Sequence, residues 1–134
     1  MLTGKQLAVL GAILSAVAVA GGAFGAHALK EMVTPDRLET FKTAISYMQW
    51  HAFAVMFLGY LFEQTTEHRF RQAATFMLLG IIIFCGSLII LVLTGLSKLG
   101  AVAPLGGVFF ILSWAMVASG FYRTMGSSVR NEEP

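Results

Sequence analysis

The sequence predicts an all-α membrane protein, with four transmembrane helices in a compact bundle and a short amphipathic interfacial helix between the first two spans. Two observations carry this prediction. Hydrophobic residues make up 57% of the 134 residues and charged residues only 12%, which is about half the charged share of a soluble domain. The charged residues also leave four long stretches of the chain without any charge.

Each charge-free stretch is long enough to cross a bilayer as a helix. A helix needs about 20 apolar residues to span a hydrocarbon core of roughly 30 Å, whereas barrel strands are about 10 residues long and alternate in polarity. The stretches hold 24, 20, 26 and 24 residues, respectively: 6–29, 43–62, 72–97 and 99–122. We therefore expect a single four-span domain with spans at about 6–28, 43–62, 72–94 and 102–122.

The first span starts like a secretory signal, with Lys5 ahead of an apolar run. This run is longer than the core of a signal peptide, so we interpret it as an uncleaved helix. Small residues four apart allow helices to approach closely in lipid, and span one carries such a stripe at Ala8, Ala12, Ala16 and Ala20. We expect span one to be the central packing helix, although the same stripe would also suit a homodimer.

Glycines in three spans are predicted to be helix-packing positions, because a missing side chain lets two backbones meet. These are Gly21, Gly25, Gly86, Gly106 and Gly107.

The connection after span one predicts a helix start. Thr34 suits an N-cap, Pro35 the first helical position, and Asp36 the positive end of the helix dipole. Apolar residues then recur at spacings of three and four from Leu38 to Met48, while charged residues fill the other face. This pattern is typical of an amphipathic helix at the membrane surface.

Positive charges favour one orientation only slightly. Five of them, Lys5, Arg69, Arg71, Arg123 and Arg130, fall on the side of the two termini. The other four are Lys30, Arg37, Lys42 and Lys98. The positive-inside rule then predicts two cytoplasmic termini. The last residues, 123–134, are polar and are expected to form a flexible tail, and Trp50, Trp114 and Tyr122 are expected to be interfacial anchors.

Composition excludes several functions. No basic run could neutralise phosphates, so no nucleic-acid partner is expected. Cys85 is the only cysteine, which rules out an intrachain disulfide. No catalytic constellation and no metal or cofactor site are predicted, and the expected partners are membrane lipid and another membrane protein or a second copy.

Polar residues gather near one membrane face in this topology, because spans one and two meet there and span three returns to it. The set is His27, Gln49, His51, Thr94 and Lys98. Ionisable residues inside a membrane are functional candidates, and we hypothesise that both histidines face the bundle interior. Hydrogen bonding between helices is the simplest role; a solute, ion or proton site and haem or metal ligation are the alternatives.

Motifs along most of the chain resemble a known family. They include 22–30 (GAFGAHALK), 41–44 (FKTA), 84–88 (FCGSL), 93–95 (LTG) and 104–107 (PLGG). Together they resemble the YgdD/YwdK-like family of small membrane proteins, catalogued as domain of unknown function 423. The sequence departs from the family at Cys85, where Ser is more usual, and at Ile89, where an aromatic residue is. The resemblance implies a four-span inner-membrane protein without an established activity.

These observations lead to three functional hypotheses. The first is a non-enzymatic accessory or assembly partner in the cell membrane, indicated by the small size and the lack of reactive groups. The second is a small-solute, ion or proton carrier that uses the polar cluster. The third is a haem- or metal-binding redox subunit, which is disfavoured because His27 lies too near the interface to share a porphyrin with His51.

Overall fold

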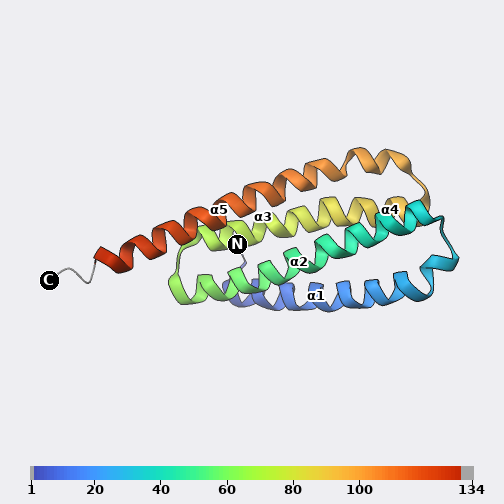
Figure 1. Ribbon diagram of the computed structural model, residues 1–134. Helices are drawn as coiled ribbons and strands as arrows, with labels where there is room; N and C mark the ends of the chain where they lie inside the picture. Colours follow the sequence, from blue (N-terminus) through green and yellow to red (C-terminus); the bar gives the residue numbers. More distant parts are fainter. Residues whose placement is uncertain (1, 131–134) are drawn as a thin grey trace.

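The computed structural model is all-helical over the residues that it describes, which are the backbone of residues 2–130 and the side chains of residues 2–125. This confirms the predicted all-α class. Four helical rods alternate in direction as an up-and-down bundle, and the first helix begins at the end of the bundle where the last helix ends (Figure 1). In order they are α1 (Gly4–His27), α2 (Pro35–Thr65), α3 (His68–Gly80) continued by α4 (Gly86–Thr94), and α5 (Ala103–Arg130).

α1 packs along α2 through small residues that recur every seven positions. Gly4, Gly11, Ala18 and Gly25 are all buried. A Cβ at Gly4 would lie 2.6 Å from the carbonyl oxygen of Gly59, and one at Gly11 would overlap the backbone nitrogen of Met56. The two backbones therefore touch at one end. At the other end side chains separate them, because Gly21 and Gly25 meet the side chains of Ile45 and Phe41.

The predicted central role of α1 is wrong. α1 lies at one edge of the bundle and α5 at the other, with α2 and the α3–α4 rod between them (Figure 1). The alanine stripe is left open, since Ala12, Ala16 and Ala20 are exposed. The heptad of glycine and alanine, and not the four-residue stripe, forms the face of α1 that packs on α2.

Two of the predicted packing glycines do not lie at a helix contact. A Cβ on Gly86 or Gly107 would meet nothing within 4 Å, whereas one on Gly106 would overlap the backbone nitrogen of Phe84. Gly80, which was not predicted, faces the ring of Phe110, and Gly120 faces the ring of Phe70. Glycine content alone does not show which side of a helix is covered.

The predicted interfacial helix is not a separate element. α2 begins at Pro35, with Thr34 as its N-cap, and continues unbroken for 31 residues to Thr65. The apolar positions Phe41, Ala44 and Met48 are buried in the bundle. Their spacing of three and four residues thus reflects packing against protein, which produces the same amphipathic pattern as packing against a membrane surface.

The third rod contains a π-helical turn, η2 (Ile81–Cys85), between α3 and α4. Such turns insert one residue into a helix and often occur at functional sites. Here the turn lies where Phe84 stacks on Tyr47 of α2, with ring centroids 4.7 Å apart.

α5 packs against α3 through a hydrogen bond and aromatic contacts. The Ser113 hydroxyl donates to the carbonyl of Ala73 at 2.7 Å, and Phe70 packs against Phe121. α5 continues to Arg130, so the predicted flexible tail is helical over 123–130, and residues 131–134 lie outside the described part of the chain.

Three segments of the described chain are long and apolar enough to cross a membrane: Gly4–Glu31, His68–Thr94 and Ser97–Met125. α2 is not one of them, because Ser46, Gln49 and His51 reduce its apolar character in the middle. Many large apolar side chains on the three segments point away from the bundle, among them Val19, Ile82 and Ile111. Such a surface suits lipid better than water.

Thr66, which ends α2, provides a small stability test. It adopts a left-handed conformation with φ 55°, which costs about 1–2 kcal/mol for a residue with a Cβ. We expect Thr66→Gly to raise the free energy of unfolding in detergent by about 1 kcal/mol. Thr66→Ala, which keeps the Cβ, should give no such gain; an equal gain would show that the backbone is not strained there.

Candidate functional site

The contacts between α1 and α2 fix the depth of each residue of α2. Ala52 faces Gly11, Ile45 faces Gly21, and Phe41 faces Gly25. His51 and Trp50 therefore lie beside the middle of α1, and Ser46 is within about 8 Å of that level at 1.5 Å per residue. The centre of α2, and not its start, carries these polar side chains.

His51 is buried, with 8% of its surface exposed, and both of its ring nitrogens have partners. Nδ1 lies 2.7 Å from the carbonyl oxygen of Tyr47, and the Trp114 indole N–H donates to Nε2 at 3.3 Å. A carbonyl can only accept and an indole can only donate, so the neutral tautomer protonated at Nδ1 satisfies both bonds. His51 thereby links α2 to α5.

Aromatic rings surround His51 on the inner side. Its ring stacks on Phe110 of α5, with centroids 3.6 Å apart, and Tyr47 lies 5.8 Å away on the preceding turn. Tyr47 in turn contacts Phe84 of η2. The cluster joins three rods at mid-height.

The predicted five-residue polar cluster does not assemble. His27, Thr94 and Lys98 are exposed, and within the described residues no hydrogen bond or ion pair joins any two of the five. His27 lies beyond Gly25, so it is about 12 residues, or roughly 18 Å, from His51 along the bundle. The prediction failed because the second span was taken to start at Thr43, although α2 already begins at Pro35.

The geometry also argues against haem or metal ligation by the two histidines. They are too far apart to share one group, and neither nitrogen of His51 is free. Among the described residues, no group of three or more His, Cys, Asp or Glu side chains is placed to hold a metal ion. Of the predicted roles for His51, a hydrogen bond between helices is the one that its contacts support.

Unpaired polar groups lie on the open side of α2 beside His51. Ser46, Tyr47, Gln49 and Trp50 occupy two successive turns, and their side chains make no hydrogen bond to any described residue. Trp50 is 70% exposed and Tyr47 is 43% exposed. Trp50 and Trp114 lie at mid-height of the bundle, whereas Tyr122, about 12 Å further along α5, lies nearer its end; the role of the three as interfacial anchors stays a prediction.

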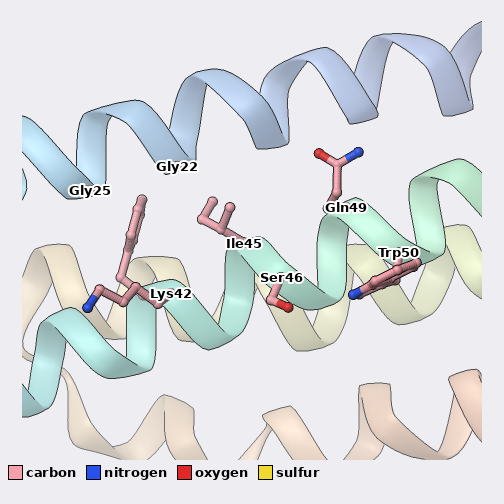
Figure 2. Close-up of a pocket in the computed structure, with 8 residues that line it drawn as sticks. Gly22, Gly25, Lys42, Ile45, Ser46, Gln49 and Trp50 are labelled. Carbon is pink, nitrogen blue, oxygen red and sulfur yellow. The ribbon is translucent and has the colours of Figure 1, made fainter.

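Two hollows flank this face of α2, and Ser46 and Trp50 line both. The apolar groove, of about 350 Å³, runs between α1 and α2 over Gly22, Gly25, Phe41 and Ile45. The aromatic hollow, of about 460 Å³, lies between α2 and α5 and is lined by Tyr47, His51 and Trp114. In Figure 2, Gln49 stands between α2 and α1, while the Trp50 indole nitrogen points toward Ser46.

Comparisons with known proteins decide the family. The family model described as a protein of unknown function, DUF423, matches residues 21–107. The chain belongs to the DUF423 family. This confirms the resemblance found in the sequence motifs.

Relatives of this DUF423 protein are named as membrane proteins. The UPF0382 membrane protein YwdK of Bacillus subtilis is 40% identical over 114 residues, which cover 84% of this chain and 93% of the relative. A UPF0382 membrane protein of Staphylococcus aureus is 37% identical over 122 residues, which cover 91% of this chain and 99% of the relative. No solved structure matches this chain.

The unpaired groups at the site of this DUF423 protein are a hydroxyl, a phenol, an amide and an indole. The two hollows are lined in addition by the Lys42 amine, the His51 imidazole and the Trp114 indole. Sequence reasoning missed Ser46, Tyr47, Trp50 and Trp114 as site residues. The signal that was present is the run of polar residues at 46, 47, 49 and 50 inside an otherwise apolar stretch.

Proposed function

We propose that this DUF423 protein is a non-enzymatic accessory protein of the cell membrane, which crosses the bilayer four times and holds a membrane-soluble partner against the open face of α2. The unpaired polar groups at mid-height carry this proposal. In lipid, each polar group without a partner is unfavourable by several kcal/mol. Four such groups on one face of α2 favour the presence of a partner other than lipid acyl chains on this face.

Chain topology supports the proposed fourth span. α1 and α3 run in the same direction, and α2 connects the end of one to the start of the other (Figure 1). If both flanking segments cross the membrane, α2 has to cross back between them. With 31 residues, or about 46 Å at 1.5 Å per residue, it is long enough.

Reporter fusions test this topology. We expect fusions at Pro134 and beside Glu67 to report the cytoplasmic side, because five of the nine Lys and Arg residues, Lys5, Arg69, Arg71, Arg123 and Arg130, belong to that side and four to the other. Fusions beside Val33 and Ser97 should report the opposite side. A cytoplasmic signal at Val33 together with an external one at Glu67 would invert the orientation, and identical signals at Val33 and Glu67 would remove α2 as a span.

Photo-crosslinking in growing cells tests the covered face. A benzoylphenylalanine replaces Phe53, which is 54% exposed and lies one turn after Trp50 on α2. The matched control replaces Ile82, which is 67% exposed on η2. We expect position 53 to capture a partner other than phospholipid and position 82 to capture phospholipid alone. Phospholipid adducts alone at both positions would contradict the proposal.

A further inference from the structure

We infer that the two hollows beside α2 form a binding site for a neutral, lipid-soluble molecule with a flat carbonyl-bearing ring and an apolar tail, the chemistry of a quinone. This inference rests on the proposed function, because it names the partner that the open face of α2 holds. The ring lies in the aromatic hollow and the tail in the apolar groove.

The aromatic hollow suits a flat ring. Tyr47, Trp50, His51 and Trp114 all line it, and aromatic rings stack favourably on one another. Its volume of about 460 Å³ lies within the usual range for small-molecule sites, which are mostly apolar with a few placed polar groups.

Each of the unpaired groups can donate a hydrogen bond. An indole N–H can only donate, and the Ser46 and Tyr47 hydroxyls and the Gln49 amide each have a hydrogen to give. The Trp50 nitrogen points toward Ser46 in Figure 2, so one oxygen placed between them would accept from both. A ring carbonyl, which only accepts, matches this set.

The charges near the site favour a neutral ligand. The aromatic hollow has no charged residue in its lining, and the groove has one, Lys42. Lys42 is already paired with Glu39, at 2.7 Å between Nζ and Oε1. A charged ligand at mid-height of the bundle would therefore have no free side chain of opposite charge beside it, and an unpaired charge at that depth in a membrane is energetically unfavourable.

The apolar groove provides room for a tail because α1 and α2 separate toward this end. A Cβ added to Gly22 would have its nearest neighbour, Ile45, at 3.9 Å, so Gly22 forms an open wall of the groove. The two hollows share Ser46 and Trp50 as lining residues, so a ligand that lies over the small Ser46 side chain would reach both.

Intrinsic fluorescence tests the inference directly, because the only two tryptophans of the sequence, Trp50 and Trp114, both line the aromatic hollow. Decylbenzoquinone, which quenches tryptophan, is titrated into purified protein in phosphatidylcholine vesicles. Saturable quenching is expected. Ser46→Ala should weaken the apparent affinity about fivefold, as for the loss of one hydrogen bond, and Gly22→Leu should weaken it about tenfold by filling the groove.

Gly107→Leu is the matched control, since a Cβ at Gly107 meets nothing within 4 Å, and it should bind as the unmodified protein does. Quenching that rises linearly with quinone and is equal in all four proteins would overturn the inference. If position 53 nevertheless captures a protein in cells, the proposed function stands and only the quinone-like partner is wrong. If position 53 captures phospholipid alone, both the proposed function and the inference of a quinone-like partner are contradicted.

Discussion

Gly11→Leu is expected to prevent α1 from packing on α2. A Cβ at Gly11 would lie 2.6 Å from the carbonyl oxygen of Ala52 and would overlap the backbone nitrogen of Met56. Backbone atoms within a helix cannot move aside as a side chain tip can, so the two helices would have to separate. Overpacking typically costs 1–3 kcal/mol, and here we expect about 3 kcal/mol or more, measured as the free energy of unfolding in mixed detergent micelles.

A smaller substitution at Gly11 and a substitution at Gly107 on α5 provide the comparison. Gly11→Ala should still lower stability, by about 2 kcal/mol, because the Cβ alone already collides with backbone. Gly107→Ala, in open space on α5, should be neutral or gain up to about 1 kcal/mol from better helix propensity. Equal stability of Gly11→Ala and Gly107→Ala would show that α1 and α2 do not touch at Gly11.

His51→Ala is expected to lower the free energy of unfolding by about 2–3 kcal/mol. It removes a buried ring that stacks on Phe110 at 3.6 Å, leaves a cavity, and leaves the Trp114 indole N–H without its acceptor. Since His51 joins α2 to α5, the change should also loosen α5, which limited proteolysis of the C-terminal segment would detect.

A double-mutant cycle separates the hydrogen bond from the packing. Trp114→Phe removes the donor and His51→Phe removes the acceptor while each keeps an aromatic ring. We expect a coupling energy of about 0.6–1.7 kcal/mol, the range for hydrogen bonds between membrane helices. A coupling near zero would mean that the 3.3 Å bond contributes nothing and that His51 acts by packing alone.

The helices could be predicted from the sequence because charge placement and apolar length are local properties. Thr34 and Pro35 indicated the start of α2 correctly for the same reason. The packing could not be predicted in this way. Ala12, Ala16 and Ala20 and the glycine heptad are both acceptable close-approach faces on α1, and only the presence of α2 on one side decides between them.

The candidate site was predicted in part. His51 and Gln49 do lie in the polar middle of α2, but His27, Thr94 and Lys98 stay near the end of the bundle. The error arose because the depth of each residue was counted from Lys42, the last charged residue before the uncharged stretch. The helix α2 begins about two turns earlier, and those turns carry the charged residues. The sequence could not identify Trp114 as a residue of the site, since its pairing with His51 depends on the register between α2 and α5.

The central claim is that α2 crosses the bilayer with Trp50 near its middle, and depth-dependent quenching of Trp50 tests it most directly. Trp114→Phe leaves Trp50 as the single tryptophan. The purified variant is reconstituted in phosphatidylcholines that carry bromine atoms either near the headgroup or near the ends of the acyl chains. We predict stronger quenching by bromines near the chain ends. Stronger quenching by bromines near the headgroup would place Trp50 at the interface and contradict the account.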